Sequence, residues 1–199
     1  MTPTGSPELL PWLEDAMAQF YQHGLAIISN AIPAALCEAL LTEVSQSNEL
    51  QPAGIGRQQQ FRHQNDIRRD HTLWLDGSTA AQQQYLARLD QLQQQVNRRC
   101  FLGLTHYECH YARYQQGDFY RKHLDAFKGR SNRVLTTVCY LNTVAQGGEL
   151  VIYDENDQWL QQVQPTAGTL VMFESERFPH EVKPALDLRF SIAGWFRND

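Results

Sequence analysis

The first hundred residues place their apolar side chains at helical spacing. Apolar residues recur every three or four positions in three segments, which is typical of helices that bury one face. The predicted helices cover residues 9–20, a segment opened by Pro33, and 78–101, with Ser78 as N-cap. Residues 25–29 and 67–75 are predicted to be extended, so the first half is mainly helical with a few strands.

The second half has a different pattern, in which short apolar runs are separated by glycine, proline, asparagine and aspartate. Such runs are typical of buried or half-buried strands. The predicted strands cover residues 107–114, 134–141, 148–153, 160–164, 169–173, 181–184 and 190–196. Several short strands with regular turn signals favour a sandwich or barrel. The preceding helices favour an α+β fold, in which they support one face of the sheet.

Length, composition and charge restrict the class of protein. The 199 residues suffice for one well-packed domain, with 42% hydrophobic and 20% charged residues. The net charge of -5 gives no general electrostatic footprint for nucleic acid, and the apolar runs are too short to cross a membrane. The start of the chain shows no secretory signal, and the four cysteines form no CxxC pair. We therefore expect a cytoplasmic protein with reduced thiols that binds neither nucleic acid nor membrane.

Two histidines and one aspartate form a candidate metal site. His123 and Asp125 form a His-x-Asp motif, and residues i and i+2 of an extended segment point to the same side. His180 follows a later predicted strand and could meet them across facing strands of a sandwich. Two imidazoles and one carboxylate leave positions open on an octahedral metal, which suits Fe(II) better than zinc. With seven histidines in the chain, this spacing alone also fits solvated or core histidines.

Arg189 is the candidate for binding an anionic ligand. It begins a predicted strand, and an arginine that points into a barrel is costly unless its charge is paired. Asp187, two residues earlier, could be that pair, which would make the arginine structural. Alternatively, a bound carboxylate could pair with Arg189 through a bidentate contact. Tyr140 and Tyr114 could each add a hydrogen bond to that carboxylate, or could simply pack in the core.

Taken together, these motifs resemble one enzyme family. The His-x-Asp motif, the Pro-His-Glu-Val segment around His180 and the strand that begins at Arg189 are similar to the iron- and 2-oxoglutarate-dependent dioxygenases. The similarity is closest to the prolyl hydroxylase branch, which includes oxygen-sensing hydroxylases of animals and bacterial relatives that act on an elongation factor. It extends over roughly residues 20–197. Further similar segments are 114–125, 140–142, 147–150 and 66–70, followed by Trp74.

The resemblance implies a fold and a division of the chain. The fold would be a double-stranded β-helix, or jelly roll, with supporting N-terminal helices. Residues 1–199 would form a single domain. Residues 1–104 would supply mainly helical support with edge strands and a substrate loop at 51–65, and residues 105–197 would form the jelly-roll catalytic core.

The resemblance also implies what the site binds. Fe(II) would bind to His123, Asp125 and His180, and 2-oxoglutarate would chelate the metal through its keto-acid end. The residues implied to contact 2-oxoglutarate or lie beside it are Arg189, Tyr140, Tyr114 and Trp195. O2 would be the other cosubstrate, and ascorbate is a candidate reductant. The implied reaction hydroxylates a C–H bond and releases succinate and CO2.

The implied substrate is a protein with an exposed prolyl loop, and elongation factor Tu is the first candidate. Residues 51–65 correspond to the loop that folds over a peptide in the prolyl hydroxylases, although a long polar loop can also be merely solvated. Tyr120 would lie close to the substrate entrance. The arginines expected to face an acidic partner segment are Arg57, Arg62, Arg68, Arg69 and Arg133.

Three other functions are kept open by the sequence. The same oxygenase chemistry could act on a free amino acid, on another small molecule or on an alkylated nucleic acid base. The nucleic acid dealkylases of this superfamily carry a second arginine six residues after the cosubstrate arginine, where this chain has Trp195. The remaining alternatives are a jelly-roll binding protein without catalysis and a cupin-like metal hydrolase.

Overall fold

The computed structural model describes residues 10–54, 66–127 and 132–199. The helices of the described residues are α1 (Trp12–His23), α2 (Ala34–Gln46) and α3 (Ala80–Cys100). Their strands are β1 (Leu25–Ile28), β2 (Gln51–Pro52), β3 (His71–Trp74), β4 (His106–Tyr114), β5 (Tyr120–His123), β6 (Arg133–Tyr140), β7 (Leu150–Tyr153), β8 (Trp159–Val163), β9 (Leu170–Glu174), β10 (His180–Val182) and β11 (Arg189–Arg197).

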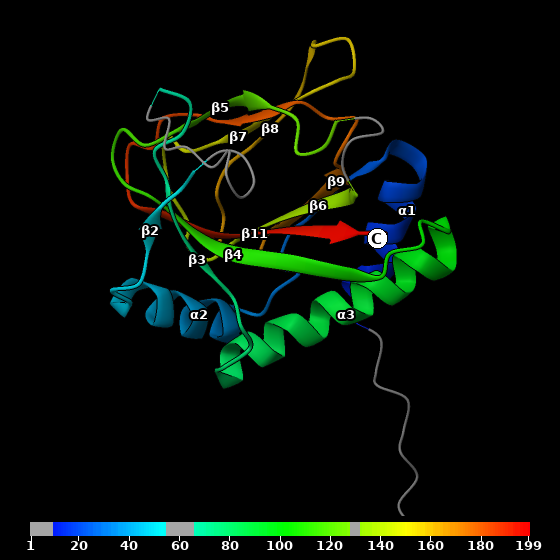
Figure 1. Cartoon of the computed structure of the whole chain (residues 1–199), viewed down its shortest axis with the longest axis horizontal. Coiled ribbons are helices and arrows are strands. Elements are labelled where there is room, and N and C mark those ends of the chain that lie inside the picture. The colour runs from blue at the N-terminus through cyan, green and yellow to red at the C-terminus, as the bar shows by residue number, and fades with distance from the viewer. Residues whose placement is uncertain (1–9, 55–65, 128–131) are drawn as a thin grey trace, which may run out of the picture.

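The strands form two antiparallel sheets that face each other (Figure 1). The larger sheet has the strand order β1-β9-β6-β11-β4-β3-β2, and the smaller sheet has the order β5-β10-β7-β8. Helices α2 and α3 lie against the outer side of the larger sheet (Figure 1). This arrangement confirms the predicted α+β fold with a jelly-roll core and supporting helices.

Strand β11 shows how the sequence divides the interior into two layers. Successive side chains of a strand point to opposite faces of a sheet. Phe190, Ile192 and Phe196 belong to the apolar core that packs against the helices. The alternate residues Arg189 and Trp195 line a cavity between the two sheets. The polar positions of this strand are therefore directed away from the main core and toward the space between the sheets.

Two differences between the observed and the predicted elements have a clear local cause. Strand β5 is not among the predicted strands because its side chains are only partly buried or exposed, so no apolar alternation marks it. The N-cap of α3 is Thr79 rather than Ser78. The hydroxyl of Thr79 accepts a hydrogen bond from the N–H of Gln82 at 3.2 Å. The N–H of Ser78 instead donates to the carboxylate of Asp76, which places Ser78 in the preceding turn.

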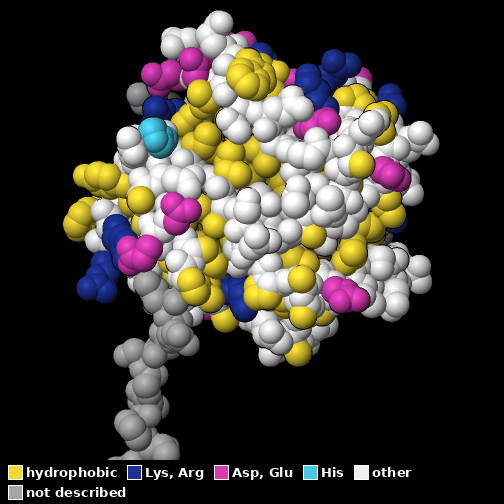
Figure 2. Space-filling view, turned by 180° about the vertical axis from the view of Figure 1, so that it is seen from behind, with side chains coloured by type: hydrophobic (Ala, Val, Ile, Leu, Met, Phe, Trp, Pro, Cys, Tyr) yellow, Lys and Arg dark blue, Asp and Glu magenta, His cyan; other side chains and the backbone are white. Residues whose placement is uncertain are grey.

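The outer surface mixes apolar and polar side chains. In the view from behind, exposed apolar side chains are scattered between polar and charged ones (Figure 2). Among the described residues, the helices are all too short or too polar to span a lipid bilayer.

Candidate active site

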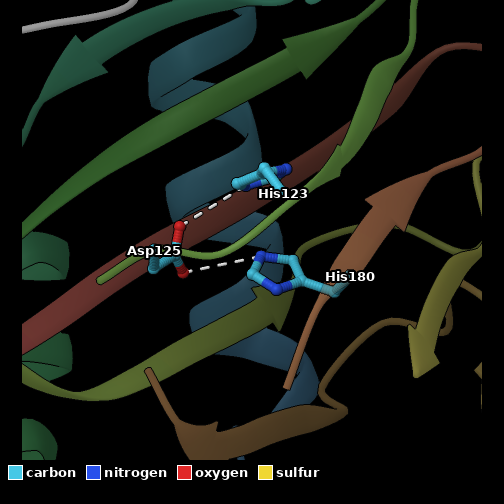
Figure 3. Close-up of side chains that lie close together, drawn as sticks. All are labelled: His123, Asp125 and His180. Atoms are coloured by element: carbon cyan, nitrogen blue, oxygen red, sulfur yellow. Dashed lines mark ion pairs between the residues drawn. The ribbon is translucent and has the colours of Figure 1, made fainter. Parts of the chain in front are cut away.

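The smaller sheet brings His123 and His180 together. His123 is the last residue of β5 and His180 the first of β10, and the antiparallel pairing of these strands makes the two histidines direct partners. Asp125 follows two residues after His123. Its carboxylate lies 3.4 Å from Nε2 of His123 and 3.5 Å from Nε2 of His180, and all three side chains point toward one another (Figure 3). The pairing of β5 with β10 thus assembles all three residues of the candidate metal site.

Backbone carbonyls fix which ring nitrogen each histidine presents. Nδ1 of His123 lies 2.7 Å from the carbonyl oxygen of Arg121, and Nδ1 of His180 lies 3.0 Å from that of Phe178. A carbonyl oxygen can only accept, so each Nδ1 carries the proton and donates it. Each Nε2 then faces Asp125 and is the ring nitrogen left to bind a metal, which is the arrangement that metal-binding histidines use.

The charges at this site also fit a divalent metal. Burial opposes ionisation of Asp125, but His180 and His123 outweigh it and hold the pKa of this carboxyl below its usual range. Burial lowers the pKa of His180 to about 4, although the charge of Asp125 opposes this shift. The three ligand atoms lie within 4.8 Å of one another.

Thr136 on β6 orients the metal-facing carboxylate. Its hydroxyl donates a hydrogen bond of 2.8 Å to Asp125, and it lies 2.9 Å from the hydroxyl of Ser175. We expect Thr136→Val to weaken metal binding about tenfold to a hundredfold, because partners of this kind hold the ligand in its binding orientation. Titration with Co(II) or Mn(II) would measure this loss.

The control for this variant is Thr137→Val. Thr137 is also buried, but it lies on the other face of β6, where its hydroxyl contacts the carbonyl of Gly194. Equal losses of metal affinity in both variants would mean that general destabilisation, and not the orientation of Asp125, is responsible.

Arg189 lies in the same cavity as the histidines and is almost fully buried. Its side chain is 1% exposed, and its guanidinium donates a hydrogen bond of 3.1 Å to Ser191. Among the described residues it has no carboxylate partner, and its Nε donates to no acceptor. The turn residue Asp187 is exposed and accepts from the neighbouring N–H of Leu188, so it does not pair with Arg189. A buried cation without an anion is costly, and a bound carboxylate would remove this cost.

Two buried tyrosines surround the Arg189 guanidinium. It lies 4.6 Å from the ring centre of Tyr114 and 5.1 Å from that of Tyr140. The hydroxyl of Tyr140 has no hydrogen-bond partner among the described residues, and burial raises its pKa although the charge of Arg189 opposes this shift. The hydroxyl therefore keeps its proton and can donate it. An unpaired cation and an unused O–H donor together match one carboxylate.

Gly148 gives Arg189 the space that it needs. A Cβ atom at position 148 would lie 2.8 Å from Cδ of Arg189, and the φ of +69° is one that side chains other than glycine rarely adopt. We expect Gly148→Ala to lower the affinity for a carboxylate ligand several-fold by displacing Arg189, in addition to its cost in backbone strain. Calorimetric titration with 2-oxoglutarate would measure the effect.

Gly103→Ala is the matched control for this variant. Gly103 has a similar φ of +64°, and nothing within 4 Å would meet its Cβ. Gly103→Ala should lose about 1 kcal/mol of folding stability, because alanine at this φ introduces backbone strain similar to that in Gly148→Ala. It should nevertheless keep its ligand affinity. Unaltered ligand affinity in Gly148→Ala would contradict the role given to this glycine.

Comparison with known proteins connects this geometry to a family. The family model described as the 2OG-Fe(II) oxygenase superfamily matches residues 109–197. A prolyl-4-hydroxylase of Pseudomonas putida is 38% identical, and its crystal structure superposes with a TM-score of 0.85 over 94% of this chain and 99% of that one. The chain belongs to the 2OG-Fe(II) oxygenase superfamily. Iron(II), 2-oxoglutarate and O2 are the cofactor and cosubstrates of that superfamily, and the residues described above fit the first two.

Other relatives are prolyl hydroxylases of animals. A Trichoplax adhaerens prolyl hydroxylase, solved with a peptide of hypoxia inducible factor, is 26% identical with a TM-score of 0.82, over 98% of this chain and 94% of that one. The hypoxia-inducible factor prolyl hydroxylase of Caenorhabditis elegans is 31% identical over 67% of this chain. This oxygenase chain spans only 20% of the nematode protein and 53% of Egl nine homolog 1 from Mus musculus, so it matches part of each.

Of the remaining predicted residues, Tyr120 and Trp195 line the cavity, and Arg133 lies beside Trp195. The ring of Tyr120 stacks on His123 with centres 3.6 Å apart, and the guanidinium of Arg133 lies 4.0 Å above the ring of Trp195. Trp195 lines the cavity and is 8% exposed. Arg57 and Arg62 lie outside the described residues.

An ion pair beside Tyr120 was not anticipated from the sequence. Arg68 donates two hydrogen bonds, of 2.8 and 2.6 Å, to the buried carboxylate of Asp70. The same guanidinium lies 4.3 Å above the ring of Tyr120. Arg68, which was expected to face a substrate, lines the cavity with its guanidinium held by Asp70. The Arg-x-Asp spacing at the start of an extended segment is the signal that could have indicated this pair.

Proposed function

We propose that this chain is an Fe(II)- and 2-oxoglutarate-dependent dioxygenase that hydroxylates a prolyl residue in a protein and releases succinate and CO2. The observation that carries the proposal is one cavity that combines two kinds of group. Its lining includes His123, Asp125 and His180, which can hold a metal, and the buried Arg189, which has no carboxylate partner among the described residues. A ligand that chelates a metal at one end and carries a carboxylate at the other suits this cavity.

Each residue of the cavity then has a role. His123, Asp125 and His180 bind Fe(II), and Arg189 pairs with the far carboxylate of 2-oxoglutarate. The hydroxyl of Tyr140 donates a hydrogen bond to the same carboxylate. Tyr114 packs against the other side of the guanidinium, and Trp195 closes the cavity beside the metal.

The cavity also protects the reaction from water. When bound, Fe(II) supplies the position at which O2 and 2-oxoglutarate react and a C–H bond of the substrate is converted to C–OH. Val138, Leu150 and Val182 contribute apolar surface to the cavity. Their side chains exclude water from the reacting groups, which favours transfer of oxygen to the substrate over side reactions.

The choice of a prolyl substrate is supported by the relatives. The Pseudomonas putida and Trichoplax adhaerens proteins carry the name prolyl hydroxylase, and the second was solved with a peptide. We propose that Tyr120 and Arg133 contact the substrate protein, together with Arg57 and Arg62 in the 51–65 loop. Elongation factor Tu is the first candidate substrate, which would place the enzyme in the cytoplasm. The site and its support form one domain, residues 1–199.

Two assays, carried out one after the other, test this proposal. The protein, supplied with Fe(II) and 2-oxoglutarate under air, should release succinate slowly even without its substrate. Addition of elongation factor Tu should increase the release, and mass spectrometry should find one added oxygen on a proline. A protein that neither binds nor turns over 2-oxoglutarate is not an oxygenase, and would instead fit the non-catalytic jelly roll.

The same assays separate the alternative substrates. Turnover that is stimulated by a free amino acid or another small molecule, but not by any prolyl protein, would assign the small-molecule function. Arg133 forms an ion pair with Glu108 at 2.7 Å, so this arginine already has an acidic neighbour. This pairing, together with the net charge of -5, gives no support to a nucleic acid substrate.

A further inference from the structure

The larger sheet has a hollow beside the metal site. Ala193 lies in the middle of β11 and is only partly buried, although Ser191 and Trp195 on the same face are buried. Its neighbours across the sheet are His110 on β4 and Val138 on β6. Because alanine is small, the space above it is left open between His110, Trp195 and Val138.

The hollow lies at the level of the metal ligands. Thr136, which holds Asp125, is two residues from Val138 and points to the same face of β6. Strand β11 lies between β4, which carries His110, and β6, which carries Val138. Adjacent strands are about 4.8 Å apart, so the backbones of His110 and Val138 are about 10 Å apart across the hollow. All of these residues line the same cavity. A substrate that reaches the metal therefore lies next to the ring of His110.

Aromatic neighbours hold the His110 ring in place. Trp74 packs edge-on against it with ring centres 5.1 Å apart, and Trp195 lies 5.2 Å away on a tilted plane. His110 is 5% exposed, whereas Trp74 is 54% exposed at the rim. A ring that is fixed by two tryptophans presents its nitrogen atoms in a defined direction.

Only one kind of hydrogen bond remains available to His110. Its Nδ1 lies 2.9 Å from the carbonyl oxygen of Tyr111, so Nδ1 must be the donor. Burial lowers the pKa of His110 to about 4; the charge of Arg68 lowers it further, and the charge of Asp70 opposes the shift. The ring is therefore neutral, and Nε2 carries no proton. Among the described residues, Nε2 makes no hydrogen bond. It is therefore an acceptor at the edge of the hollow.

We propose that His110 is a substrate-binding residue whose Nε2 accepts a hydrogen bond from the peptide N–H that follows the target proline. This assignment rests on the proposed prolyl hydroxylase function. Proline has no N–H of its own, so the nearest backbone donor next to its ring is the N–H of the following residue. A carbonyl group could not take this place, because Nε2 has no proton to donate. The hollow thereby selects the orientation of the peptide chain at the metal.

A chemical change in the substrate tests the proposal without altering the fold of the protein. The probes are short synthetic peptides that together cover every proline of elongation factor Tu, and the one that the wild type hydroxylates best is selected. In its ester analogue, the amide after the target proline is replaced by an ester, which removes the N–H alone. With Mn(II) and 2-oxoglutarate bound, the wild type should bind the ester about tenfold more weakly than the amide.

Substitution of His110 completes a double-mutant cycle. His110→Phe keeps an aromatic ring between the tryptophans and removes the acceptor, so it should bind the amide peptide about tenfold more weakly than the wild type and should not distinguish amide from ester. His110→Gln restores an acceptor oxygen and should regain part of the preference for the amide. Equal binding of both peptides by the wild type, or fully additive losses, would overturn the proposal.

A second measurement is independent of any substrate. Nitrogen-15 NMR of the histidine side chains should show His110 as the neutral tautomer with the proton on Nδ1. A proton on Nε2 would overturn the proposal, because the ring could then donate but not accept. If succinate is released but no peptide is hydroxylated, the proposed prolyl substrate is wrong, and the tautomer still decides whether the hollow presents an acceptor.

Discussion

Arg189→Met is expected to reduce the affinity for 2-oxoglutarate at least about a hundredfold. Truncation of one partner of a buried, hydrogen-bonded charge pair typically costs about 2–5 kcal/mol, which corresponds to a loss of this order. The guanidinium is almost fully buried and has no carboxylate partner among the described residues, so the ligand would supply the only opposite charge beside it. Calorimetric titration of the Mn(II)-loaded protein with 2-oxoglutarate measures the loss directly, independently of turnover.

The same variant should change stability in an unusual direction. Without ligand, Arg189→Met should unfold at the same temperature as the wild type or a higher one, because it removes a buried cation that has no anion. With 2-oxoglutarate present, the wild type should gain stability and the variant should gain none. Arg98→Met is the control, since Arg98 is exposed on α3. Wild-type affinity in Arg189→Met would show that 2-oxoglutarate does not pair with this residue.

His123→Ala and Asp125→Asn are expected to lose metal binding and succinate release together. Each removes one of the three residues proposed to bind the metal. Metal affinity should therefore fall by more than about a hundredfold, which is the upper limit expected for a supporting residue such as Thr136. Asp125→Asn keeps the shape of the side chain and removes the charge that balances a divalent ion. Metal content after reconstitution with Fe(II) under nitrogen, followed by succinate release under air, measures both effects.

His106→Ala is the control for the metal ligands. His106 begins β4, its side chain is 50% exposed, and its Nε2 is near the C-terminal Asp199 rather than the cavity. It should bind metal and release succinate as the wild type does. A His123→Ala protein that retains wild-type metal affinity would remove this histidine from the metal site. Removal of the metal from the wild type by a chelator should stop turnover, and added Fe(II) should restore it.

The sequence predicted His123, Asp125 and His180 as candidate metal ligands partly because strand geometry is periodic. It could not show that these three side chains lie together in the folded chain. The His-x-Asp motif predicted that His123 and Asp125 lie close together, and they do, although Asp125 is in a bend just after β5 rather than in the extended segment. Whether His180 joined them depended on the pairing of β5 with β10. Strand β5 lacks an apolar pattern, so neither its existence nor its partner was visible in the sequence.

The role of Arg189 was ambiguous in the sequence for a similar reason. Asp187 is two residues away, and only the structure shows that it lies exposed in a turn. Thr136, Gly148 and His110 escaped the sequence analysis because each acts on a residue far along the chain, across a strand pair or a loop. Their contributions are set by register, which single-residue patterns do not encode.

The proposed transfer of one atom of O2 to a prolyl residue, at the expense of 2-oxoglutarate, is tested most directly with oxygen-18 gas. The protein is incubated under this gas with Fe(II), 2-oxoglutarate and elongation factor Tu. We expect a prolyl residue to gain one oxygen-18 atom and succinate to be released with it, with neither product formed by His123→Ala. Intact 2-oxoglutarate and no labelled residue, from a protein shown to contain iron, would contradict the proposed reaction.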